Sequence, residues 1–352
     1  MAAYTTIDDP SAYFECQLYT GTGSSNAVTF NDTDTDMQPD FVIIKDRDSG
    51  SNSHVTTDVV RGVNKILFTD STSTALTDAA RVSSYNSDGF TVGTDGSTNT
   101  NTNTYVAWCW KANGSGAANS EGNTTTTKTS ANTTSGFSII TYDGDGAAAT
   151  LGHGLGAVPH FIIQKNLSDT ENWQVYHHKN TAAPETDYLT LNTNNATGDQ
   201  SSRWNDTAPT STLISIGSDS SVSQSGESML MLAWSEKQGF SKFGKYTGNG
   251  NADGAYVHLG FRASLIILKR TGASDHWWIH DNKRGGYNGN NKVLYTNIAN
   301  AESDSTSIDI LSNGFKIRTT DSGYNPSGAN MVYMAWADAP FVNSEGVPAT
   351  AR

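Results

Sequence analysis

Three parts of this chain repeat the same landmarks in the same order, and this repetition constrains the fold more than any other feature of the sequence. Each part opens with a tyrosine and a glycine-containing turn, continues to an apolar pentamer ending in lysine, and closes with an aromatic strand ending in tryptophan. The first tyrosine and the last tryptophan lie 91, 92 and 90 positions apart. Such regular spacing predicts three copies of one domain. The landmarks are YTGTG (19–23), FVIIK (41–45) and YVAWCW (105–110); YDGDG (142–146), FIIQK (161–165) and MLMLAW (229–234); and YTGNG (246–250), LIILK (265–269) and MVYMAW (331–336).

The repeat divides the chain into residues 1–112, 135–237 and 238–352, the last with a C-terminal tail. Residues 113–134 lie between the first two copies and consist largely of Gly, Ser, Thr and Asn, a composition typical of a flexible connector or an extended loop. Only the pentapeptide SEKQG intervenes between the second copy and the third. We therefore expect copies two and three to pack closely and the first copy to sit apart.

The composition favours many short strands over helices. Hydrophobic residues make up 36% of the chain and charged residues 16%, while 33 glycines and abundant Ser, Thr, Asn and Asp supply turns. Aromatic residues reach 10%, too many for a disordered chain. Short apolar runs bounded by turn residues are typical of strands, and little of the sequence has helical periodicity. We predict an all-β protein of three tandem β-sandwich repeats, jelly-roll-like or lectin-like.

The closing strands indicate where each core lies. In YVAWCW, Val106, Trp108 and Trp110 share one face of the strand. FVIIK is apolar at every position before its lysine, so we expect both faces of that strand to be covered. A buried tryptophan removes roughly 150–250 Å² from water, worth on the order of 4–6 kcal/mol before entropy. The closing tryptophan should therefore anchor the core of each copy.

Charge and hydropathy argue against nucleic-acid binding, membrane insertion and signal-dependent secretion. The net charge of −13 repels nucleic acid and anionic membranes, so we expect no nucleic-acid partner. No apolar stretch approaches the length of a membrane span, so membrane insertion is not expected either. The N-terminus lacks the basic start and apolar core of a secretory signal, which predicts synthesis in a cytosol and release, if any, by another route such as host lysis.

The chain has two cysteines, Cys16 and Cys109, too few for a disulfide framework and not spaced for zinc. We interpret both as small buried apolar side chains. Because both fall in terminal strands of one repeat, a single bond between them stays open.

Several phrases together resemble a family of virion structural proteins encoded by marine tailed bacteriophages and described as tail-fibre-like. The resemblance covers nearly the whole chain, and the phrases are specific as a set. It implies a protein displayed on a virus particle rather than an enzyme, and it brings no catalytic residues. The phrases are TTIDDPSAYF, SDGFTVGTDG, YVAWCWKA, HGLGAVPHFIIQKN, FSKFGKYTGNG, NGFKIRTTDSG and YMAWADAPFVNSEGVPATAR.

The sequence offers no catalytic constellation, and its metal and ligand candidates are few. Asp32, Asp34 and Asp36 alternate in NDTDTD, a spacing that can supply oxygens to Ca²⁺ in an irregular loop, although the glycine and distal glutamate of an EF-hand are missing. The alternative is a solvated acidic loop. No other cofactor is expected.

Sugar binding is the better ligand hypothesis, because exposed aromatic rings in turn-rich segments stack on sugars while Asn and Asp bind hydroxyls. The candidates are Trp204 in SRWNDT, Tyr287 in GGYNGNN and Tyr324 in DSGYNPSG, with packing under their own loops as the alternative.

These observations predict a phage virion protein, made in the host cytoplasm and located at the virion surface, that displays β-sandwich modules to other virion proteins and to host surface polysaccharide. A tail fibre or tail tip with an attachment role is the first expectation. A capsid decoration or head-fibre protein, or a polysaccharide-degrading tailspike, are the alternatives. We expect a homo-oligomer, a trimer by analogy with fibres.

Overall fold

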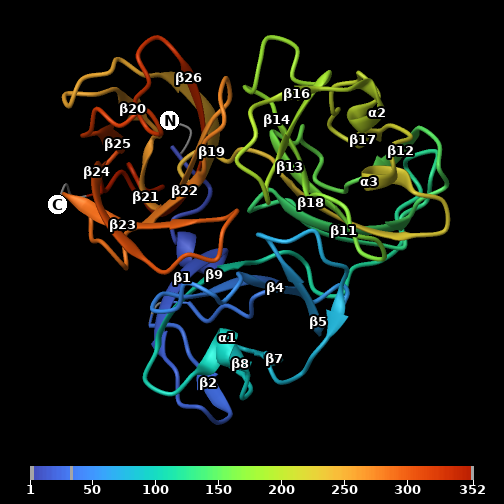
Figure 1. Ribbon diagram of the computed structural model, residues 1–352, viewed down its shortest axis with the longest axis horizontal. Coiled ribbons are helices and arrows are strands. Elements are labelled where there is room, and N and C mark those ends of the chain that lie inside the picture. Colours follow the sequence, from blue (N-terminus) through green and yellow to red (C-terminus); the bar gives the residue numbers. More distant parts are fainter. Residues whose placement is uncertain (1–3, 32–34, 350–352) are drawn as a thin grey trace.

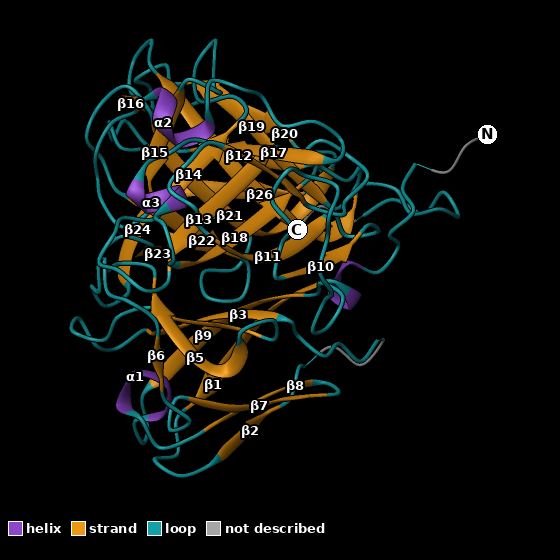
Figure 2. Ribbon diagram, turned by 90° about the vertical axis from the view of Figure 1, so that its right-hand side faces the viewer, coloured by secondary structure: helices purple, strands orange, loops and turns teal. Residues whose placement is uncertain are grey.

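The structure is a computed structural model that describes residues 4–31 and 35–349. Strands dominate it, which confirms the all-β prediction. Within residues 4–31 and 35–349 the helical segments are single turns, and the three α-helical turns lie along one side of the molecule (Figure 2). They are η1 (Pro10–Ala12), α1 (Gly96–Asn99), α2 (Ser201–Trp204) and α3 (Ser220–Ser223).

Three large antiparallel sheets form the body and surround a common centre (Figure 1). In hydrogen-bonded order, the first sheet contains β1 (Phe14–Thr20), β9 (Thr104–Trp110), β3 (Phe41–Asp46), β4 (Val55–Asp58), β5 (Gly62–Phe68) and β6 (Leu76–Thr77). A small sheet of β2 (Asn26–Val28), β8 (Gly89–Val92) and β7 (Val82–Asn86) accompanies it.

The second sheet has the order β10 (Lys128–Asn132), β11 (Phe137–Asp143), β18 (Ser228–Trp234), β13 (Phe161–Asn166), β14 (Gln174–His177), β15 (Asp187–Thr190) and β16 (Gly198–Asp199). Its companion is the pair β12 (Ala149–Gly152) and β17 (Leu213–Ile216). The third sheet continues into its companion strands without a break, as β19 (Ser241–Thr247), β26 (Asn330–Pro340), β21 (Phe261–Arg270), β22 (Trp277–Asp281), β23 (Asn290–Tyr295), β24 (Ser303–Leu311), β25 (Gly314–Ile317) and β20 (Tyr256–His258).

The same strand order recurs in all three sheets. In each, the strand that carries the turn tyrosine pairs with the closing strand, which pairs with the apolar pentamer, followed by the next two strands along the chain. The register agrees as well, because Trp110 lies opposite both Phe14 and Phe41, as Trp234 lies opposite its own two phenylalanines. Trp336 occupies the same position in the third sheet.

The turn tyrosines explain why the YxGxG sequence recurs. Tyr19, Tyr142 and Tyr246 each donate a hydroxyl hydrogen bond, of 2.6–2.7 Å, to a backbone carbonyl about 80 residues later. The glycine two positions on approaches the same later segment so closely that a Cβ at Gly144 would lie 2.4 Å from a backbone oxygen. Only glycine permits that approach. The turn therefore clamps the first strand to the segment that leads into the closing strand.

The lysines that end the three apolar pentamers also behave alike. Lys45, Lys165 and Lys269 are buried, and each ammonium donates to the carbonyl of the following residue at 2.6 Å. Burial lowers the pKa of each to about 8. The lysine thus caps the pentamer strand from within the protein rather than facing solvent.

The closing tryptophans meet at the centre of the molecule. Ring centroids of Trp110, Trp234 and Trp336 lie 5.3–6.2 Å apart, and all three pairs are edge-to-face. In that arrangement the positive edge of one ring meets the negative face of the next. The prediction that these residues anchor the core is confirmed, but the core they anchor is shared by all three sheets.

Tryptophan hydrogen bonds link the sheets in a ring. Trp173, which directly precedes β14 of the second sheet, donates its indole N–H to the carbonyl of the last residue of β5, at 3.0 Å. Trp277 of the third sheet donates to the last residue of β15, at 2.9 Å. Trp108 of the first sheet donates to Asp281 of the third, at 3.2 Å.

The expectation that the first copy sits apart is therefore wrong. Besides sharing the central core, the first sheet contacts the third through a bidentate ion pair between Arg47 and Glu302, at 2.8 and 2.9 Å. The predicted connector 113–134 is not a free chain, since β10 lies within it and pairs with β11.

Candidate functional site

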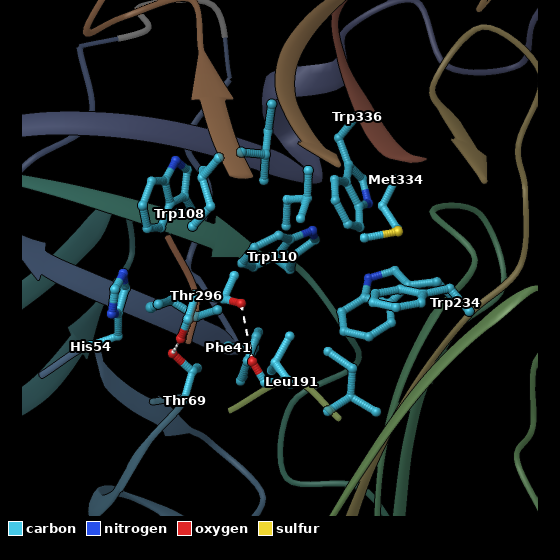
Figure 3. A pocket seen from close by; sticks show the side chains of 16 residues that line it. Phe41, His54, Thr69, Trp108, Trp110, Leu191, Trp234, Thr296, Met334 and Trp336 are labelled. Atoms are coloured by element: carbon cyan, nitrogen blue, oxygen red, sulfur yellow. Dashed lines mark hydrogen bonds between the residues drawn. The ribbon is translucent and has the colours of Figure 1, made fainter. Parts of the chain in front are cut away.

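An apolar cavity of about 40 Å³ lies where the three sheets meet (Figure 3). Its walls come from all three sheets, and Figure 3 shows Trp234 and Trp336 toward one end, His54 at the other and Trp110 between them. The volume suffices for a water molecule, whose share of the liquid is about 30 Å³, but not for a sugar. We assign this cavity to packing.

His54 lies at one end of this cavity. By strand register it is the counterpart of Trp173 and Trp277, the residues that bridge to a neighbouring sheet. The smaller imidazole is fully buried, and neither ring nitrogen has a hydrogen-bond partner within the described residues. Burial lowers its pKa well below the ordinary value. At this junction the bridge between the first and third sheets comes instead from Trp108, whose ring stacks on His54 with centroids 6.5 Å apart.

A better candidate site is an open groove between the second and third sheets, which we call the lysine groove. It consists of two adjoining hollows of about 560 and 440 Å³ that share Glu236 and Lys242. The first hollow is lined by His178, Lys179, Thr181, Ala182, Pro184, Phe243, Gly244, Lys245 and Tyr333, and the second by Tyr4, His160, Lys237, Gln238, Gly239, Ser241, His258, Leu259 and Gly260.

Histidines at the end of β14 hold the two sheets together beneath the groove. His177 Nε2 lies 3.2 Å from the carbonyl oxygen of Tyr333 in β26, and His178 Nε2 lies 2.5 Å from that of Phe243 in β19. The His178 ring also packs edge-to-face on His160, with centroids 4.5 Å apart. Burial lowers the pKa of His177 to about 3 and that of His178 to about 4. Both rings are therefore neutral at neutral pH, and they contribute shape rather than charge.

The charge of the groove comes from lysines. Lys179 and Lys245 are exposed on its rim, while Lys242 is held by a 2.8 Å hydrogen bond to the carbonyl of His258. Glu236 is the single carboxylate among the lining residues, and it accepts a hydrogen bond from the backbone N–H of Phe243 at 2.8 Å.

Tyr333 forms part of the floor. It is 3% exposed, and burial, followed by the charge of Glu236, raises its pKa. Its hydroxyl makes no hydrogen bond with the described residues, and it rises beside Gly244, where a Cβ would lie 2.4 Å from the hydroxyl oxygen. A buried phenol with a free donor therefore faces the groove.

The structure does not bring the three predicted sugar-binding residues together. Trp204 is 1% exposed and packs on Tyr176, with ring centroids 6.0 Å apart, inside the core of the second sheet and its companion. Tyr324 is fully buried, and its hydroxyl is hydrogen-bonded to His280 Nε2 at 2.9 Å. Neither ring can stack on a sugar, so these two assignments are corrected: both pack under their own loops. Tyr287 is partly buried, and its hydroxyl donates to Asp338 at 3.0 Å.

The calcium hypothesis falls largely outside the described residues, since Asp32 and Asp34 lie there and Asp36 is described as exposed. Over residues 4–31 and 35–349, no three His, Cys, Asp or Glu side chains gather as metal ligands. Cys16 and Cys109 are both free and buried, as interpreted from the sequence.

Sequence reasoning missed the lysine groove, although a signal was present. SEKQGFSKFGK (235–245) carries three lysines within nine positions of an otherwise acidic chain, and HHK (177–179) adds the fourth. Nothing in the sequence says that these segments face each other. That proximity depends on the contact between the end of β14 and the strands β19 and β26, which is a property of the tertiary structure.

Comparison with known proteins gives a family but no function. Residues 9–340 match the family described as a domain of unknown function, DUF7483, and the chain belongs to that family. No curated protein matches the chain. In the described residues, no helix is long and apolar enough to cross a membrane.

Proposed function

We propose that this protein is a structural component of a bacteriophage virion that displays three copies of one β-sandwich unit as a single rigid body. The observation that carries the proposal is the recurrence of one strand order and one tryptophan register in three sheets that share an aromatic core. The resemblance of the sequence to tail-fibre-like proteins of marine tailed phages supplies the virion context.

The physical properties of this body suit attachment. Each large sheet is covered on both faces, which makes the units stiff, while the loops between strands remain free to vary. A stiff body with variable loops and an open groove can hold an extended ligand without much ordering cost. We therefore favour a tail fibre or tail tip with a role in attachment to a host surface glycan. A homotrimer of the chain remains part of this proposal, since three chains about an axis would multiply weak contacts.

Location and copy number on the particle test the proposal. Purified virions of the phage that encodes this chain would be dissociated and quantified by mass spectrometry against the major capsid subunit, and intact particles labelled with gold-conjugated antibody. A fibre or tail-tip protein appears in a few copies, in threes or sixes, at the tail. A stoichiometric ratio to the capsid subunit would indicate a decoration protein, and absence from the particle would refute the proposal.

The tailspike alternative makes a separate prediction. A polysaccharide-degrading spike would shorten purified host polysaccharide, which size-exclusion chromatography with reducing-end detection would show. An attachment protein binds the polysaccharide and leaves its length unchanged.

A further inference from the structure

The lining of the lysine groove carries a net positive charge, whereas the chain as a whole is negatively charged. The chain carries a net charge of −13, yet the residues lining the two hollows include four lysines and one glutamate. At physiological ionic strength the field of distant charges is screened over about 8 Å. A ligand inside the groove therefore feels Lys179, Lys242 and Lys245 more strongly than the acidic surface elsewhere.

The lysine ammonium groups of the groove are also available to a ligand, because acidic side chains do not neutralise them within the described residues. Lys242 is tethered to a backbone carbonyl, which fixes its place without neutralising it. The carboxylate among the lining residues, Glu236, already accepts a backbone N–H and lies 3.8 Å from the neutral ring of His178. No ion pair joins Lys179, Lys237 or Lys245 to an acidic side chain within the described residues, whereas Lys283, Lys292 and Lys316 each have one.

We propose that the lysine groove binds an anionic sugar of an acidic polysaccharide, a residue that carries a carboxylate or a sulfate. This inference rests on the attachment function proposed above and specifies its ligand. The ammonium groups of Lys179 and Lys245 meet the anionic substituent from the rim. The Tyr333 hydroxyl donates from the floor, and the free oxygen of Glu236 accepts from a sugar hydroxyl.

The mixture of groups favours a sugar over a bare anion. A site for inorganic phosphate would gain from arginine forks and backbone N–H groups and would avoid a carboxylate. Here a carboxylate and a phenol lie among lysines, a combination that suits alternating hydroxyl and anionic substituents. The open shape of the groove, which extends across two hollows, suits a chain of sugars more than a single ion.

Binding of defined oligosaccharides to the full chain tests the proposal. The probes are a galacturonic acid hexasaccharide, a sulfated hexasaccharide and neutral maltohexaose, titrated by calorimetry at 50 and 500 mM KCl. We expect one or both anionic probes to bind, the neutral probe to bind at least tenfold more weakly, and affinity to fall at high salt. Failure of both anionic probes to bind at millimolar concentration would overturn the inference.

Variants locate the binding. Lys179→Gln combined with Lys245→Gln should weaken anionic binding at least tenfold. Lys65→Gln combined with Lys292→Gln removes the same charge from elsewhere and should change binding less than twofold. Tyr333→Phe keeps the buried ring, removes the free hydroxyl and should weaken binding threefold to tenfold at unchanged thermal stability. Equal losses in the two double variants would show nonspecific attraction and refute the groove as the site.

This experiment can fail independently of the proposed function. A chain that binds no acidic sugar but appears at the phage tail keeps its structural role and loses only this ligand. A chain that binds acidic sugars through the groove but is absent from virions keeps the site and loses the virion assignment.

Discussion

His177 gives a quantitative test of how the second and third sheets are joined. The residue is 1% exposed, with Nε2 3.2 Å from the carbonyl of Tyr333 and Nδ1 accepting the backbone N–H of Lys179 at 3.1 Å. Burial, reinforced by the neighbouring His178, lowers the pKa of its imidazole from 6.5 to about 3. The ring therefore stays neutral in the folded protein at pH 5, whereas it is protonated in the unfolded chain.

The sign of the effect on stability follows from proton binding. Between pH 6.5 and about 3 the unfolded chain binds a proton at His177 that the folded protein does not. Acid therefore favours unfolding, and the stability present above pH 6.5 is progressively lost as the pH falls. At pH 5 the unfolded chain lies 1.5 units below its pKa, which at about 1.4 kcal/mol per unit costs about 2 kcal/mol for this residue alone.

Urea unfolding at pH 7 and pH 5, followed by tryptophan fluorescence at constant ionic strength, measures this cost. His177→Gln keeps an amide that can donate to the Tyr333 carbonyl but cannot titrate. We expect the variant to lose about 1 kcal/mol at pH 7 because one ring contact disappears, and to show a pH-dependent loss about 2 kcal/mol smaller than the wild type. His258→Gln, at an exposed position, controls for the loss of a histidine from the chain.

Two results would refute this reasoning. One is a wild-type protein whose free energy of unfolding is the same at pH 7 and pH 5. The other is a His177→Gln variant that loses as much stability on acidification as the wild type does. Either would mean that the imidazole is not held neutral between the sheets.

Three further predictions concern the core. Trp234→Ala should cost about 3–5 kcal/mol and leave a single unfolding transition, since the three sheets share that core; separate transitions in calorimetry would contradict it. Gly144→Ala should cost more than about 2 kcal/mol because the new methyl group meets a backbone oxygen, while Gly272→Ala, with open space around it, should stay within about 0.5 kcal/mol in urea unfolding. Cys16 and Cys109 should react with a thiol reagent such as Ellman's only when the protein unfolds, because burial raises the pKa of both thiols; rapid labelling of the folded protein would speak against the structure.

Much of each sheet could be predicted from the sequence, because period and spacing are local properties. The alternation in YVAWCW placed Val106, Trp108 and Trp110 on one face, and all three lie in the shared core, while the alternate residues lie in the core beneath the companion sheet. The apolar pentamer FVIIK was expected to be covered on both faces, and Phe41 and Val42 do fall in different cores.

The candidate site could not be predicted in the same way. Lys179 follows β14 and Lys245 lies within β19, so the groove exists only because the second sheet meets the third through His177 and His178. Trp204, Tyr287 and Tyr324 were predicted to bind sugar because they lie in polar, turn-rich segments, from which an exposed ring was inferred. At Trp204 those neighbours form a helical turn that folds the indole inward, and local polarity does not record that direction.

The misplacement of the first copy has a more general physical cause. A long polar connector reports only that the joined parts need not be adjacent, and it carries no information about the surfaces that meet. That information lay in the large sheets themselves.

A sandwich sheet needs one apolar face, yet β3 and β9 are apolar on both, and the second face had to be covered by something other than the companion sheet. Three copies of a sheet with a spare apolar face can satisfy one another by packing around a common centre. The closing tryptophans, at the same register in each copy, fill the space where the three spare faces converge. The strands that are apolar on both faces therefore held the information about this association, whereas the connector did not.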